Sequence, residues 1–320
     1  MNTFDKLARV AVILCLCVIV LGAWVRLTDA GLGCPDWPGC YGELVVPGDP
    51  GAAAAWPERP LESGKAWREM IHRYAAGTLG LLVLALALIA WRRRGEPGQP
   101  LALPTFLLGL IVLQAMLGMW TVTLLLKPLV VMLHLLGGMT TLAILFWLAR
   151  RPAPIAPPAD TGLRRFALIG LVVLGLQIAL GGWVSTNYAA LACPDFPTCQ
   201  GSYWPTMDFA TGFDPWHGIG IDYEGGILNN AARVAIHFTH RLGAVVAAVV
   251  LALLAWRAWR QPGLSAAAGW LAAALTTQLV LGVIMVMTQL PLSLATAHNG
   301  VAALLLLSVV NLNKVVRHEN

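Results

Sequence analysis

Eight long apolar stretches constrain the fold of this 320-residue chain more than any other feature of its sequence. An α-helix needs about 20 apolar residues to cross a bilayer, and each stretch reaches or approaches that length. They lie at Val10–Val25, Tyr74–Trp91, Leu101–Leu126, Leu129–Ala149, Phe166–Val184, Arg233–Trp256, Leu264–Met287 and Leu294–Leu312. Only 12% of the residues are charged, whereas a soluble domain has about 25%. Because a backbone inside a bilayer must satisfy its own hydrogen bonds, the sequence predicts an all-α integral membrane protein with eight transmembrane helices.

Positive charge is distributed unevenly between the two sides of this topology. If the N-terminus, the loops after the second, fourth and sixth helices and the C-terminus share one side, that side contains most of the 21 lysines and arginines and few of the 16 acidic residues. Cytoplasmic loops contain the excess of Lys and Arg, so we expect cytoplasmic termini and two long outer loops, residues 27–70 and 185–232. The net charge of +5 follows from this topology and does not indicate nucleic-acid binding. A cleaved signal peptide is the alternative for the first stretch, but its end, LGAWV, matches LGGWV in an internal stretch.

A set of sequence landmarks occurs twice in the same order. The first copy contains LGAWV, CPDWPGC, EMIHR and then His134, and the second contains LGGWV, CPDFPTC, HFTHR and then His298. Matching landmarks are 159 to 168 residues apart, which is typical of a duplicated structural unit. Each half has four spans, so the halves share one orientation in the membrane. The sequence predicts two tandem pseudo-symmetric four-helix bundles, residues 1–150 and 166–320, joined by a proline-rich cytoplasmic linker at 151–165.

Each half contains two histidines near the outer ends of its even-numbered spans: His72 and His134 in the first half, and His240 and His298 in the second. Ionisable residues inside spans are costly and indicate function. Two neutral imidazoles that face each other across a bundle can bind haem iron from both sides, so we expect His72 to pair with His134 and His240 with His298. Hydrogen bonding between helices is the simpler alternative. Zinc is a weaker one, because zinc sites use three or four protein ligands.

Charged residues accompany one histidine of each pair. Arg73 and Arg241 directly follow such a histidine and are candidates for contacts with haem propionates, since guanidinium suits carboxylates; the alternative is arginines that extend to the membrane interface. Glu69 is three residues before His72 and shares its helix face, whereas the second half has His237 at that position. Glu69 is therefore the candidate catalytic acid, base or electrostatic stabiliser. The alternative is a charge at a helix start that favours the macrodipole.

Two cysteine pairs lie in the long outer loops, Cys34 with Cys40 and Cys193 with Cys199, each in the frame CPDxPxC. The outside of a bacterial inner membrane is oxidising, so disulfide bonds are permitted there. The spacing leaves two interpretations open, a structural staple and a thiol/disulfide redox pair.

Taken together, these motifs resemble the haem A synthase (CtaA/Cox15) family. The similar segments are CPDWPGC, EMIHRYAAG, LQAMLGMWTV with PLVVMLH, CPDFPTC, and DYEGG followed by IHFTHRLGA, and the resemblance covers nearly the whole chain. It implies an oxidoreductase that converts the methyl group on carbon 8 of haem O to a formyl group through a hydroxylated intermediate. The product, haem A, would serve cytochrome oxidases.

The resemblance also implies roles for individual residues. The C-terminal half would hold haem b at His240 and His298, and the N-terminal half would take the substrate haem at His72 and His134. The family's essential glutamate matches Glu69. Its outer-loop cysteine pair matches Cys34 and Cys40.

The implied setting is a bacterial inner membrane, with membrane lipid, a haem O-forming farnesyltransferase and an electron donor as partners; a homo-oligomer is compatible with it. Two other classes compete: a di-haem b cytochrome that only transfers electrons, for example to quinone, and a transporter built from parallel repeats. The replacement of Glu69 by His237 in the second half favours the enzyme. A transporter predicts paired helix breaks at mid-membrane, which the sequence lacks.

Overall fold

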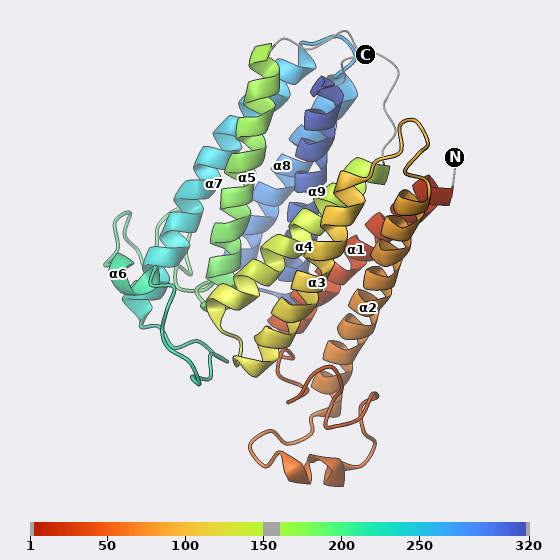
Figure 1. The fold of residues 1–320 in the computed structure, drawn as a ribbon. Coiled ribbons are helices and arrows are strands. Elements are labelled where there is room, and N and C mark those ends of the chain that lie inside the picture. Colours follow the sequence, from red (N-terminus) through yellow and green to blue (C-terminus); the bar gives the residue numbers. More distant parts are fainter. Residues whose placement is uncertain (1–2, 150–160, 318–320) are drawn as a thin grey trace. The chain divides into compact units, whose positions relative to one another are not determined.

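In the computed structural model, which describes residues 3–149 and 161–317, the regular structure is helical (Figure 1). Within these ranges two short helices, η1 (Pro50–Ala55) and α6 (Phe209–Gly212), lie in the long loops. Eight further helices are long and apolar enough to span a membrane, which confirms the all-α prediction with eight spans. They are α1 (Thr3–Leu27), α2 (Ser63–Arg92), α3 (Ala102–Thr123), α4 (Pro128–Ala149), α5 (Thr161–Thr186), α7 (Asn230–Trp259), α8 (Ser265–Met287) and α9 (Leu292–Arg317).

Several helices extend beyond the apolar stretches that predicted them. Helix α2 begins at Ser63, well before the predicted start at Tyr74, because backbone hydrogen bonds continue a helix through polar residues that hydropathy does not detect. Glu69 consequently lies in the second turn of α2 instead of at its start. The macrodipole acts within the first turn of a helix, so the interpretation of Glu69 as a helix-terminal charge loses its basis.

The chain divides into two compact units. Unit 1 comprises Met1–Leu148 and Pro215–Gly226, and unit 2 comprises Ala149–Asp214 and Ile227–Asn320. In unit 1, α2 packs against both α1 and α3; in unit 2, α5, α7, α8 and α9 close a four-helix bundle in which each helix contacts two others. The predicted linker at 151–165 lies outside the described residues as far as 160, and residues 161–165 begin α5.

Segment Pro215–Gly226, which we call the crossing segment, belongs to unit 1 although the loop around it belongs to unit 2. Its anchor is Tyr223, which is 2% exposed. The backbone N–H of Tyr223 donates to the carbonyl of Leu125 at 3.1 Å. The ring packs with three buried apolar side chains from the loop between α1 and α2 and from the end of α3, namely Leu32, Val122 and Leu126.

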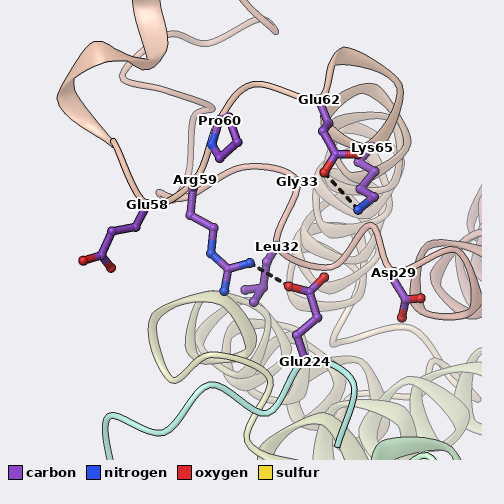
Figure 2. A pocket seen from close by; sticks show the side chains of 9 residues that line it. All are labelled: Asp29, Leu32, Gly33, Glu58, Arg59, Pro60, Glu62, Lys65 and Glu224. Atoms are coloured by element: carbon purple, nitrogen blue, oxygen red, sulfur yellow. Dashed lines mark hydrogen bonds and ion pairs between the residues drawn. The ribbon is translucent and has the colours of Figure 1, made fainter.

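Charged side chains hold the same segment at its edges. Arg59 donates to Asp222 at 2.5 Å and to Glu224 at 2.6 Å, the second of which is drawn in Figure 2. The ammonium of Lys127 donates to the carbonyl of Gly218 at 2.9 Å. The sequence repeat assigns this segment to the second half, whereas its partners lie in unit 1.

Candidate functional site

In unit 1 both histidines lie against glycines of neighbouring helices. His72 extends from α2 toward α1, where a Cβ atom added to Gly22 would lie 2.9 Å from its Cε1. His134 on α4 packs similarly against α3, where a Cβ on Gly118 would lie 3.4 Å from its Cε1. The Nδ1 atoms of both rings are buried without a hydrogen-bond partner. The two rings are close enough to interact electrostatically, and their pairing as ligands of one haem stays a prediction.

In unit 2 the second pair has the same kind of packing. A Cβ on Gly181 of α5 would lie 3.2 Å from Cε1 of His240, which extends from α7. A Cβ on Gly282 of α8 would lie 3.2 Å from Cε1 of His298, which extends from α9. These two rings are also close enough to interact electrostatically. Each of the four imidazoles therefore lies in a notch beside a glycine of the facing helix, and in three of them, at Gly22, Gly181 and Gly282, a Cβ atom would be closer than an ordinary van der Waals contact.

Two glutamines contact the histidines of unit 2. Nε2 of Gln177 donates to Nδ1 of His240 at 3.1 Å, and Nε2 of Gln278 lies 3.1 Å from Nε2 of His298. Sequence analysis missed both contacts, although an amide inside an apolar span is itself a signal of function. It also missed the four glycines, which have no chemical group that would single them out.

Glu69 and Arg73 hold the first cysteine loop. The carboxylate of Glu69 is 4% exposed; its Oε2 accepts the backbone N–H of Cys34 at 2.9 Å, and its Oε1 pairs with Arg73. The guanidinium of Arg73 also donates to the carbonyls of Asp36 at 2.9 Å and Gly39 at 2.5 Å. The predicted contact of Arg73 with a propionate stays a prediction, because the described partners of this side chain are the loop and Glu69.

Unit 2 has the matching arrangement with a histidine in place of the glutamate. His237 is buried, and its Nδ1 donates to the carbonyl of Ala189 at 2.9 Å. Nε of Arg241 donates to Nε2 of His237 at 3.1 Å. The remaining donors of Arg241 bind three carbonyls of the second cysteine loop, those of Cys193, Asp195 and Thr198. In both units the arginine therefore ties the helix to its cysteine loop.

Both predicted cysteine pairs form disulfide bonds. Cys34 and Cys40 have Cα atoms 4.8 Å apart, and Cys193 and Cys199 have Cα atoms 4.5 Å apart. All four residues are buried.

An aspartate closes each disulfide loop. The carboxylate of Asp195 accepts the backbone N–H groups of Gln200 at 2.6 Å and Gly201 at 2.9 Å, and Asp36 accepts the matching pair of N–H groups in the first loop. The hydroxyl of Thr198, together with these N–H groups, lowers the pKa of Asp195 to about 2. The carboxylate form is therefore part of the loop structure at neutral pH.

A polar pocket lies among the long loops of unit 1 (Figure 2). Its walls carry an ion pair between Lys65 and Glu62 at 3.0 Å and another between Arg59 and Glu224 at 2.6 Å. None of the four histidines lines this pocket. Among the described residues there is also no group of three or more His, Cys, Asp or Glu side chains that could hold a metal ion.

The fold and the site together define a multi-pass helical membrane protein with a pair of histidines and a disulfide-closed loop in each unit. The chain belongs to the COX15-CtaA family, described as cytochrome oxidase assembly protein, whose model matches residues 5–310. A protein of Shewanella oneidensis named heme A synthase is 45% identical over 98% of this chain and 97% of its own length. Another of the same name, from Bradyrhizobium diazoefficiens, is 31% identical over 98% of this chain and 91% of its own.

Proposed function

We propose that this protein is a haem A synthase, which oxidises the methyl group on carbon 8 of haem O to a formyl group through a hydroxylated intermediate. The observation that carries the proposal is similarity over essentially the whole chain to relatives named heme A synthase, 45% identical in one case. The paired imidazoles of each unit supply a physical basis. A cytochrome that only transfers electrons is not favoured, since the matched relatives have the name of an enzyme.

The histidines of unit 2 fit a resident haem b. His240 and His298 each have one ring nitrogen contacted by a glutamine amide, which leaves the other nitrogen for iron. Nδ1 of His298 is buried and has no hydrogen-bond partner, as expected for a nitrogen that is available to bind a metal. When bound, an iron porphyrin supplies redox chemistry that no side chain has. We propose Arg241 as a propionate contact as well as an anchor of the second cysteine loop.

The histidines of unit 1 suit the substrate. We propose that His72 and His134 take haem O, because their buried Nδ1 atoms lack partners and lie in an apolar bundle. Arg73 is the corresponding candidate for a propionate. The polyprenyl tail of haem O is apolar and would reach the bundle from the lipid, where the spans expose large apolar side chains.

Glu69 is the proposed catalytic residue of unit 1. One turn of α2 separates Glu69 from His72, so both face the same side of the helix. The hydrogen bond from Cys34 and the ion pair with Arg73 hold the carboxylate in one position. A carboxylate held there can stabilise positive charge or take a proton as hydrogen is removed from the substrate methyl group.

The disulfides are proposed to be structural staples. Buried disulfides resist thiol reductants, whereas labile redox pairs are exposed or strained, and all four cysteines are buried. The Cys34–Cys40 loop also supplies the N–H that binds Glu69. We place these loops on the periplasmic side of a bacterial inner membrane, with both termini cytoplasmic. The proposed partners are an electron donor and the haem O-forming farnesyltransferase.

Pigment extraction tests the function directly. The chain is expressed in a host that makes haem O and lacks its own haem A synthase, and membrane haems are separated and weighed by mass spectrometry. A formyl-bearing haem in these cells, and not in cells with the empty vector, is the expected result. Accumulation of haem O alone, with the protein present in the membrane, would contradict the proposal.

A further inference from the structure

The two units differ in what contacts their histidines. We infer that Gln177 and Gln278 are positioning residues that hold the rings of His240 and His298 through side-chain amides, whereas His72 and His134 of unit 1 meet backbone groups of Val18 and Gln114 and no such amide, so that one of them can turn aside during turnover. The inference rests on the proposed function, and it assigns the stable and the exchangeable imidazoles to named residues.

The first contrast is between α5 and α1. Gln177 donates to Nδ1 of His240 and to the backbone carbonyl of the same residue, both at 3.1 Å. In the register that aligns LGGWV with LGAWV, the residue matching Gln177 is Val18. The ring of His72 there meets the backbone of Val18, and no side-chain amide contacts its buried Nδ1.

A second difference between matching positions of the two units accompanies the first. The carboxamide oxygen of Gln177 lies against Gly243 of α7, so closely that a Cβ on Gly243 would overlap it. The residue that matches Gly243 in unit 1 is Ala75. A glutamine therefore occurs with the glycine that makes room for its amide, and a valine occurs with an alanine whose methyl group fills that room.

The second contrast concerns glutamines that occur in both units. Gln278 contacts Nε2 of His298. The matching residue, Gln114, lies instead against Gly137 of α4, where a Cβ would overlap its amide, and its Nε2 has no hydrogen-bond partner. The residue that matches Gly137 in unit 2 is Val301. In unit 1 the amide of Gln114 lies in the space beside Gly137. In unit 2 the side chain of Val301 fills the matching space, so Gln278 stays in contact with His298.

Hydrogen bonds to the second ring nitrogen orient a ligating histidine and select its tautomer. An imidazole that binds iron through Nε2 has its proton on Nδ1. A half-turn of the Gln177 amide would bring its buried, unpartnered Oε1 to Nδ1 of His240 to accept that proton in place of the donating Nε2. If both His72 and His134 bound iron, no position would stay open for dioxygen, so one of the two rings would have to move aside for oxidation. A ring without an amide partner moves at lower cost.

Carbon monoxide is the probe, because it binds ferrous haem only when a ligand histidine leaves. The experiment uses purified holoenzyme and compares CO-difference spectra of haem b. Gln177→Val copies Val18 into unit 2, and Val301→Gly copies Gly137. Loss of one hydrogen bond corresponds to about a 2- to 10-fold rise in the rate of CO binding in each variant. The matched control is Leu176→Val, at a neighbouring position of α5 that is exposed, and it should leave the rate unchanged.

The reverse exchange tests unit 1. Val18→Gln with Ala75→Gly should lower CO binding by bound haem O and slow formyl production, while the haem b spectrum stays the same. Val18→Leu is the control for size. If haem b is present and both unit 2 variants bind CO at the wild-type rate, the inference is wrong while the proposed function stands. If wild-type protein holds no haem b, the proposed function itself fails. If Gln177→Val does not fold, the CO-binding rate of Val301→Gly, which keeps Gln177, tests the inference by itself.

Discussion

Replacing Gly181 by alanine puts one methyl group against the imidazole of His240. The added Cβ would lie 3.2 Å from Cε1 of that ring, whereas carbon atoms prefer about 3.5–4.0 Å, so the ring must move by about 0.3–0.8 Å. Overpacking of this kind costs about 1–3 kcal/mol. If the strain is relieved by loss of the ligand geometry, haem b affinity falls by about 5- to 150-fold.

The control for this substitution lies on the same helix. Gly175→Ala adds the same methyl group at a position where no atom lies within 4 Å, and alanine favours a helix over glycine by about 0.8–1 kcal/mol. The assay is the rate at which haem b transfers from each purified variant to an excess of apomyoglobin, followed by absorbance. We expect a faster rate for Gly181→Ala and a wild-type rate for Gly175→Ala. Equal rates for the two variants, with the same haem content, would refute the notch as the device that positions His240.

Three further substitutions or conditions test other parts of the structure. Glu69→Gln keeps an oxygen for the N–H of Cys34 but removes the charge, so we expect it to retain both haems and lose formyl production; normal turnover would exclude catalysis by this carboxylate. Tyr223→Ala removes the buried anchor of the crossing segment at about 3–5 kcal/mol and should expose residues 215–226 to protease. Tyr223→Phe keeps the ring and loses the hydroxyl bond to Gly218, worth about 0.5–1.5 kcal/mol. Equal cleavage of the two variants would contradict the packing. The pKa of Asp195 is lowered from 3.8 to about 2, so the carboxylate stabilises the second cysteine loop fully above pH 3.8 and loses this effect as the pH falls through about 2. Amide hydrogen exchange at Gln200 and Gly201 should therefore show protection at pH 4. Loss of protection well above that pH would count against the assignment.

The helix boundaries show how far hydropathy predicts this fold. The apolar stretch at Tyr74–Trp91 located α2 correctly but not its start at Ser63. The residues between Ser63 and Tyr74 are polar enough to escape a hydropathy criterion. They include Glu69 and Arg73, whose spacing of four residues already suits a pair on one helix face. A search for helix periodicity beyond the apolar stretch would have placed both inside the helix.

The sequence by itself determined the class of protein, the eight spans, the two cysteine pairs and the four histidines. Each of these is a local property, such as apolar length, residue type or the spacing of a repeated motif, and can be read along the chain. The assignment of haem b and haem O to the two pairs came from resemblance and is still a proposal.

Only the tertiary structure decided which groups meet. The loop carbonyls that bind Arg73 and Arg241, the glycine notches beside the imidazoles, and the packing of Tyr223 in unit 1 all join residues distant in sequence. Gln114 and Gln278 illustrate the reason. They match in type and in their sequence distance from a histidine, yet only the side-chain amide of Gln278 contacts that ring, whereas His134 meets the backbone of Gln114. The difference follows from the space that a glycine or a valine leaves on the neighbouring helix, and such space exists only once the helices have packed.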